Sequence, residues 1–320
     1  MNNDQKLRAL YFGAGLFIIL FGVEKIIESG VANSTLGHYY KVNLIAGHLI
    51  DPEVACFGSS VGEVAINAKL IGQKTRRVVY NFCIDGTRFI QYNGLVKELN
   101  ESASNCKLVI MAETSFSLSQ VAQLTEPDRF IAHINNQNIY ASLFDVQPGL
   151  ARKMKYVPFY RFIVAKQRYY RAAATGLLQY RNRLSFQDSL SGFTPKDKGW
   201  EPGLDDLNRS TRPLEIIIDT AVLTAYKTTI KQLREKGREV LIIIPPIYKD
   251  GLRLLPDLVK IRTALSSLQG EGIYFRDYSW CEISNEKKYF YNNSHVNREG
   301  ANVFSLKLAT AVDSILSRAK

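Results

Sequence analysis

The sequence predicts an α/β protein with a mostly parallel central sheet of about five strands, covered by helices on both faces. From about residue 50 onward, short apolar runs alternate with segments in which apolar residues recur at helical spacing. Strands separated by helices of this length favour parallel pairing with a helical layer on each side. Ligand sites in such sheets lie at the carboxyl ends of the strands. The loops that follow the strands are therefore the first places to look for functional residues.

Five apolar runs predict the strands, at residues 54–57, 78–84, 108–112, 240–244 and 273–275. Helices are predicted at residues 61–71, behind Gly86, ahead of Val240 and behind Gly300. The helix ahead of Val240 is the plainest, because Gly237 stands where a helix terminator is expected. Together these elements define an α/β domain over residues 45–320.

An uncharged apolar block occupies residues 9–23, with Lys6 and Arg8 before it and Glu24, Lys25 and Glu28 after it. Its 15 residues fall short of the ~20 of a usual spanning helix, but flanking cations can extend it by snorkelling. We expect residues 1–30 to form a single-pass membrane anchor. The alternatives are a cleaved signal peptide ending near residues 30–32 and a buried helix of a soluble protein. Because positive charge leads, the N-terminus should stay cytoplasmic and the rest should face the periplasm or cell exterior.

A long interruption, at about residues 115–212, separates the third and fourth predicted strands. Within it, residues 152–183 carry nine basic residues and no acidic one, in a chain of net charge +11. The basic residues are Arg152, Lys153, Lys155, Arg161, Lys166, Arg168, Arg171, Arg181 and Arg183, and seven tyrosines and phenylalanines are mixed among them. We interpret residues 150–190 as a basic aromatic helical insertion suited to an anionic membrane surface. The alternative is a helical face whose charge is merely solvated. Nucleic acid, the other acidic partner, is not expected for an exported chain.

The four cysteines show neither CxxC spacing nor a pattern with histidine that suits zinc. Three of them lie in or beside predicted strands, so buried thiols are expected. We expect no metal and no organic cofactor.

A serine pair stands at the corner between the first predicted strand and its helix, in Gly58-Ser59-Ser60. A serine there is either a helix cap or a nucleophile exposed at the edge of the sheet. A nucleophilic serine needs a base and a group that orients the base. His295, in the loop before the last helix, is placed to reach the same edge.

With these residues the chain resembles SGNH/GDSL hydrolase-fold proteins, which implies a three-layer flavodoxin-like fold. It is most similar to the membrane-anchored branch of D-alanyl-lipoteichoic-acid biosynthesis and alginate-type O-acetylation proteins. The resemblance spans residues 54 to about 304. It is carried by four stretches, residues 57–60, 81–86, 192–195 (Gly-Phe-Thr-Pro) and 292–301 (Asn-Asn-Ser-His-Val-Asn-Arg-Glu-Gly-Ala). The resemblance implies Ser60 as nucleophile, His295 as base, and the backbone N–H groups of Ser60 and Gly86 as the oxyanion hole.

Two positions depart from the family pattern. Asn292 stands where the family has its orienting aspartate, and Glu113-Thr114-Ser115 stands where a Gly-x-Asn block would follow the third strand. An asparagine can hold the imidazole tautomer but cannot stabilise an imidazolium as a carboxylate does. Asn292 is therefore either the orienter or a structural residue at a helix entry.

The resemblance implies an acyltransferase or esterase that acts on O-acyl esters of cell-envelope polysaccharide. Its expected partners are that glycan or another acyl acceptor, the membrane, and a membrane-bound acyl donor protein. The alternative is a catalytically impaired protein on the same fold, with a binding or assembly role in an envelope acylation or export system.

Overall fold

The computed structural model describes residues 2–179 and 189–318, which form two compact units. The sheet unit comprises Ile50–Thr125 and Gln187–Lys320, and the helical unit comprises Met1–Leu49 and Glu126–Phe186. Most of the expected insertion at residues 150–190 falls within the helical unit, which also includes residues from Glu126 onward and the N-terminal residues. Four residues of the expected basic segment, Tyr180, Arg181, Asn182 and Arg183, lie outside the described residues.

The sheet unit contains a five-stranded sheet in the order β2-β1-β3-β4-β5, and every neighbouring pair is parallel. The prediction of an α/β protein with a parallel sheet of about five strands is confirmed. The strands are β1 Val54–Gly58, β2 Val79–Asn81, β3 Leu108–Ala112, β4 Glu239–Ile244 and β5 Ile273–Asp277.

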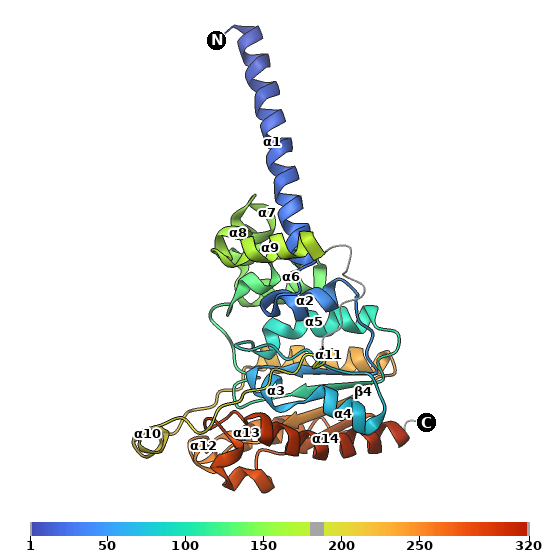
Figure 1. The fold of residues 1–320 in the computed structure, drawn as a ribbon, viewed down its shortest axis with the longest axis vertical. Helices are drawn as coiled ribbons and strands as arrows, with labels where there is room; N and C mark the ends of the chain where they lie inside the picture. Colours follow the sequence, from blue (N-terminus) through green and yellow to red (C-terminus); the bar gives the residue numbers. More distant parts are fainter. Residues whose placement is uncertain (1, 180–188, 319–320) are drawn as a thin grey trace. The chain divides into compact units, whose positions relative to one another are not determined.

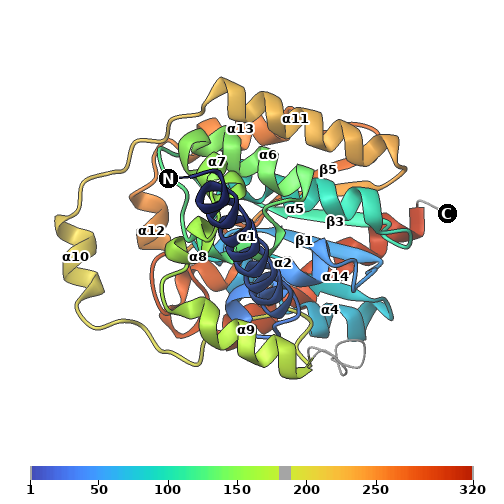
Figure 2. The ribbon, with the colours of Figure 1, turned by 90° about the horizontal axis from the view of Figure 1, so that it is seen from above.

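Helices cover both faces of the sheet (Figure 1). Helices α5 (Phe89–Ser102) and α11 (Thr220–Glu235) pack together on one face, while α3 (Ser60–Ala65) and α4 (Ala68–Thr75) pack against α14 (Arg298–Arg318) on the other. The remaining helices of this unit are α10 (Leu204–Ser210), α12 (Lys249–Arg253), α13 (Leu258–Ser266) and the 3-10 helices η3 (Glu282–Asn285) and η4 (Lys287–Tyr289). Helix α10 stands away from the sheet in a long connection between α9 and α11 (Figure 2).

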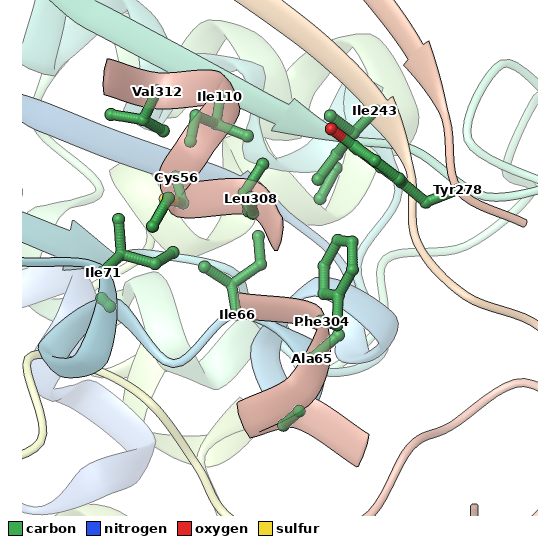
Figure 3. Packing of buried hydrophobic residues seen from close by; sticks show 14 of the residues in the cluster. Cys56, Ala65, Ile66, Ile71, Ile110, Ile243, Tyr278, Phe304, Leu308 and Val312 are labelled. Atoms are coloured by element: carbon green, nitrogen blue, oxygen red, sulfur yellow. The ribbon is translucent and has the colours of Figure 1, made fainter. Parts of the chain in front are cut away.

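One part of the hydrophobic core lies between the sheet and the last helix. Cys56, Ile110 and Ile243 on three neighbouring strands pack in one apolar cluster with Leu308 and Val312 of α14 (Figure 3). All five side chains are fully buried. Burial of aliphatic side chains stabilises the fold by roughly 1.5–3 kcal/mol each, so α14 and the strands form one rigid support.

The predicted helix at residues 61–71 is in fact two helices. The backbone is interrupted at Ile66 and Asn67, where Asn67 caps α4 by accepting the N–H of Leu70 at 3.1 Å. The N–H of Asn67 in turn donates to Ser305 Oγ of α14 at 2.8 Å. An asparagine favours such a cap because its side chain competes for backbone hydrogen bonds.

The helical unit consists of α1 (Asn3–Ala32), α2 (Gly37–Ala46), the 3-10 helix η1 (Pro127–His133), α6 (Gln137–Val146), α7 (Pro148–Tyr156), α8 (Tyr160–Val164) and α9 (Arg168–Gln179). Helix α1 has 30 residues, and its most apolar 18-residue window has a mean hydropathy of 1.9. It is long and apolar enough to cross a membrane, as a signal sequence also is. Most large apolar side chains between Leu10 and Ile26 are exposed.

The C-terminal end of α1 is packed tightly within the helical unit, where it crosses α9 (Figures 1 and 2). A Cβ on Gly30 would lie 2.5 Å from the backbone oxygen of Ala173, and a Cβ on Gly176 would collide with the backbone of Gly30. Only glycine at both positions allows the two backbones to approach this closely.

A buried ion pair adds to this contact. The guanidinium of Arg161 in α8 donates to Glu24 Oε1 through Nε at 3.1 Å and through Nη2 at 2.8 Å, and to Glu28 Oε2 at 3.2 Å. Only 4% of Arg161 and 8% of Glu24 are exposed. One cation of the basic segment is therefore a structural partner of α1 rather than part of a solvated face.

We expect Arg161→Met to lower the free energy of unfolding of the helical unit by about 3–5 kcal/mol, because it leaves the Glu24 carboxylate buried without a partner. Pulse proteolysis of the full chain across a urea series, mapped to cleavage sites within the helical unit, measures this loss. Arg171→Met is the matched control, since Arg171 is exposed, and should change stability by no more than about 0.5 kcal/mol. Adding Glu24→Leu to Arg161→Met should restore stability, and failure to do so would contradict the explanation.

Candidate active site

Ser60 lies at the carboxyl end of β1, at the corner predicted from the sequence. A Cβ on Gly58 would lie 2.4 Å from the backbone oxygen of Ala112, so the chain turns directly against the end of β3. Ser59 occupies the N-cap position of α3, but its side chain makes no capping hydrogen bond. Ser60 is the first residue of that helix, and its hydroxyl contacts His295 instead. The serine pair does not cap the helix through the Ser59 side chain.

His295 is held in a closed loop between η4 and α14. Phe290 and Val296 form an isolated β-bridge, and the N–H of Tyr291 donates to the backbone oxygen of His295 at 3.1 Å. Asn297 secures the end of the loop, since its side chain donates to the Lys288 backbone oxygen at 2.6 Å. The loop brings His295 Nε2 to 2.8 Å from Ser60 Oγ, across 235 residues of sequence.

Asn292 contacts the other imidazole nitrogen. Its Oδ1 accepts the backbone N–H groups of Ser294 at 3.1 Å and His295 at 3.0 Å, and lies 2.9 Å from His295 Nδ1. An oxygen that already accepts two N–H groups is an acceptor for Nδ1 as well, so the proton belongs on Nδ1. Ser294 Oγ, 3.1 Å from Nδ1, is a second neighbour of that nitrogen. Nε2 is then free to accept the Ser60 hydroxyl proton.

The surroundings of His295 keep its imidazole neutral. Burial lowers the pKa of His295, and the charge of Lys196 lowers it further, while the carboxylates of Asp85, Glu201 and Glu63 raise it by less. The net shift is downward from the usual value of about 6.5. A neutral imidazole at neutral pH is the protonation state that a general base needs.

Gly86, the predicted second oxyanion donor, lines the same cleft as Ser60 and His295. Its φ is +73°, a conformation that favours glycine, and a Cβ there would lie 2.9 Å from Thr125 Cγ2. Within residues 2–179 and 189–318, no protein acceptor takes the backbone N–H of Ser60 or Gly86. These are the two N–H groups that an oxyanion hole at Ser60 would use.

The residues after β3 take the place of the missing Gly-x-Asn block. Glu113 is fully buried, and its carboxylate accepts the Tyr92 hydroxyl at 3.0 Å. Burial raises the pKa of Glu113, and the hydrogen bonds from Ser117 and Tyr92 offset part of that rise. Thr114 and Ser115 follow it and line the cleft.

The cleft at Ser60 has a volume of about 330 Å³. Besides the residues predicted from the sequence, it is lined by Arg88, Phe116 and an apolar group formed by Val61, Leu214, Ile247, Leu254 and Leu255. Ile247 could have been found from the sequence, because it stands soon after β4, at the carboxyl end of a predicted strand. Leu214 lies in a stretch without regular secondary structure, where no pattern marks it.

The four cysteines, all within the described part of the chain, are not joined in disulfides; Cys56, Cys83 and Cys106 are buried and Cys281 is partly exposed. Among the described residues, no group of three or more histidine, cysteine, aspartate or glutamate side chains is arranged to hold a metal ion.

Comparisons with known proteins identify no family. No family model matches the chain, and no curated protein matches it. Among solved structures, the chain is similar to one described as "a putative platelet activating factor from Streptococcus pneumonia", with 10% identity and a TM-score of 0.41, over 97% of this chain and 100% of that one. At that identity and TM-score the similarity does not assign a family.

Proposed function

We propose that the protein is a membrane-anchored, extracytoplasmic SGNH-type acyltransferase or esterase that acts on O-acyl esters of cell-envelope polysaccharide. The observation that carries the proposal is the hydrogen-bonded series Ser60–His295–Asn292, with distances of 2.8 and 2.9 Å, whose first two members line a cleft at the carboxyl edge of the sheet. A nucleophile, a base and a residue that orients the base are the groups that acyl transfer through serine requires.

The SGNH-type fold is supported by where the groups lie along the chain. Ser60 follows the first strand, Gly86 follows the second, and His295 precedes the last helix. That order matches the blocks of the family that the sequence resembles. The parallel sheet brings the ends of β1 and β2 to one edge, where these groups meet.

In the proposed reaction, Ser60 Oγ attacks the acyl carbonyl while its proton passes to His295 Nε2. The backbone N–H groups of Ser60 and Gly86 stabilise the oxyanion. The bond from the acyl carbon to the alcohol oxygen then breaks, and the imidazolium returns the proton to the departing alcohol. A sugar hydroxyl or water next gives its proton to His295 and attacks the acyl-enzyme, which releases the acyl product and restores the Ser60 hydroxyl.

The packing of α1 favours an uncleaved anchor over a cleaved signal. Cleavage near residues 30–32 would cut through the buried crossing of Gly30 with α9 and remove Glu24, the partner of Arg161. Lys6 and Arg8 precede the apolar block, so the positive-inside rule places the N-terminus in the cytoplasm.

Localisation is tested by intact mass and protease access. We expect the membrane-bound chain to retain residues 1–30, because their removal would expose the surface of α9 that packs on α1. Protease added to spheroplasts should digest the sheet unit. A mature chain that begins near residue 33, or a sheet unit protected until the cells are lysed, would contradict the anchor or the extracytoplasmic location, respectively.

The side chains exposed on α7 to α9 support the proposal that the basic segment binds a membrane surface. Exposed cations include Arg152, Lys153 and Lys166, and exposed apolar or aromatic side chains include Tyr156 and Ile163. Mixed cationic and aromatic surfaces suit the headgroup region of anionic bilayers. A membrane-bound acyl donor protein would approach the same membrane surface.

A second candidate, a binding or assembly protein on this fold, is favoured by Asn292. The amide leaves the imidazolium without a carboxylate partner at Nδ1. Such a protein would hold an acylated glycan in the cleft without turning it over, and Ser60→Ala would leave its binding intact.

The pH profile of ester turnover tests the proposed function. Since burial lowers the pKa of His295, kcat/KM should rise with pH along a limb centred below the usual histidine value of about 6.5 and be flat at neutral pH. Glu201→Gln removes a carboxylate that raises this pKa, so the limb should move to still lower pH. A limb above pH 7, or one that does not respond to Glu201→Gln, would count against His295 as the base.

A further inference from the structure

The lining of the cleft at Ser60 contains two chemically different groups of residues. One group comprises the predicted catalytic residues Ser60 and His295 and the hydroxyl-bearing Thr87, Thr114 and Ser115. The other group is the aliphatic wall, made up of Val61, Leu214, Ile247, Leu254 and Leu255. The aliphatic residues come from α3, from the segment before α11, and from both ends of α12. The side chains of the aliphatic wall carry no hydrogen-bond donor or acceptor.

The aliphatic wall packs against the loop that carries His295. The N–H of Leu214 donates to the backbone oxygen of Leu254 at 2.8 Å, and the N–H of Tyr248 donates to the backbone oxygen of Asn293 at 3.0 Å. A Cβ on Gly251 would lie 2.6 Å from that same Asn293 oxygen, so α12 lies directly against the loop. The aliphatic wall is therefore fixed in position relative to the base.

The segment before α11 is joined by hydrogen bonds to the same loop. Asn208 of α10 and Asn293 exchange a pair of side-chain hydrogen bonds, of 2.9 and 2.6 Å. The N–H of Glu201 also donates to the backbone oxygen of Tyr291 at 3.0 Å. These contacts hold Leu214 at the cleft although its segment has no regular secondary structure.

From this arrangement we infer that the cleft binds an aliphatic acyl chain longer than acetyl, and that Leu214 and Leu254 determine the preferred chain length. The inference rests on the acyl-transfer function proposed above. A sugar would bury hydroxyl groups without partners against the aliphatic wall, which costs free energy. An acetyl group would leave most of that wall without contact, whereas each methylene placed on it gains apolar burial.

Turnover of p-nitrophenyl acetate, butyrate and hexanoate by the full chain in lipid nanodiscs tests the inference. Each buried methylene is worth roughly fourfold, so kcat/KM for hexanoate should exceed that for acetate by at least about tenfold. Leu214→Ser should lower the ratio of hexanoate to acetate by about tenfold. Leu306→Ser is the matched control, because Leu306 is 43% exposed on α14 and Leu214 is 44% exposed. Acetate as the best substrate, or equal ratios in the two variants, would overturn the inference.

A binding measurement separates this inference from the proposed function. The p-nitrophenyl esters of hexanoate and acetate are bound to the Ser60→Ala variant in nanodiscs, and the signal from empty nanodiscs is subtracted. Tighter binding of hexanoate that weakens with Leu214→Ser, together with no turnover of any ester by the wild-type chain, would support the acyl-chain site and refute the catalytic function. Turnover that is insensitive to chain length would support the function and refute the acyl-chain site. Absence of both turnover and chain-dependent binding would refute both.

Discussion

Replacement of Ser60 by alanine is expected to reduce ester turnover by on the order of 10⁴-fold or more. The substitution removes the nucleophilic hydroxyl, whose oxygen lies 2.8 Å from His295 Nε2. His295→Ala should cause a loss of similar size, and the double variant should be no worse than either single one, because the two groups act as a unit. Steady-state kinetics with an activated ester, on chains whose far-UV circular dichroism matches the wild type, measure these losses.

Ser59→Ala is the matched control for Ser60→Ala. The two serines are adjacent at the same corner and both line the cleft, but only Ser60 contacts His295. We expect Ser59→Ala to cost less than about tenfold, since its side chain makes no capping bond and touches no catalytic nitrogen. Similar losses in the two variants would mean that the corner contributes packing rather than a nucleophile.

Asn292→Asp is expected to raise kcat/KM by one or more orders of magnitude. A carboxylate at this position would accept the same two backbone N–H groups and the Nδ1 proton, and it would also stabilise the imidazolium that forms during the reaction. The reverse change in a serine protease costs about 10⁴-fold. The carboxylate would raise the pKa of His295 as well, so the acidic limb of the pH profile should move to higher pH.

Asn302→Asp adds the same charge in the first turns of α14 and serves as control. The Asn302 oxygen accepts the Asn67 side chain at 2.8 Å, a bond that aspartate can keep. Its effect on kcat/KM should stay within about threefold, because the Asn302 side chain pairs with Asn67 rather than with His295. A lower rate in Asn292→Asp than in the wild type would show that the amide itself is required.

Much of the sheet could be predicted from the sequence because β1, β3 and β4 are almost entirely buried and read as apolar runs. The third strand was predicted with the bounds that β3 has, and β1 and β4 differ from their predictions by one residue at one end. The helix at residues 61–71 was predicted as continuous because the apolar spacing runs through Asn67. At that break the N–H of Asn67 donates to Ser305, a partner 238 residues further along the chain that local spacing does not reveal.

The pairing of Ser60 with His295 could be anticipated because both stand next to regular elements whose ends meet at one sheet edge. The aliphatic wall could not be, because Leu214 is placed by hydrogen bonds to Leu254 and by the Asn208–Asn293 pair rather than by periodicity. By its sequence Arg161 belongs with the basic segment, because charge patterning does not reveal which side chains are buried. Its ion pair with Glu24 joins residues 137 positions apart.

Covalent labelling of Ser60 is the most direct test of the catalytic account. The full chain in detergent or nanodiscs is treated with a fluorophosphonate probe and digested, and the labelled peptide is identified by mass spectrometry. The account predicts that one serine, Ser60, is labelled, and that labelling slows by orders of magnitude in His295→Ala, because the neutral imidazole removes the hydroxyl proton. An unlabelled Ser60 in a folded chain, or labelling at the same rate with and without His295, would contradict it.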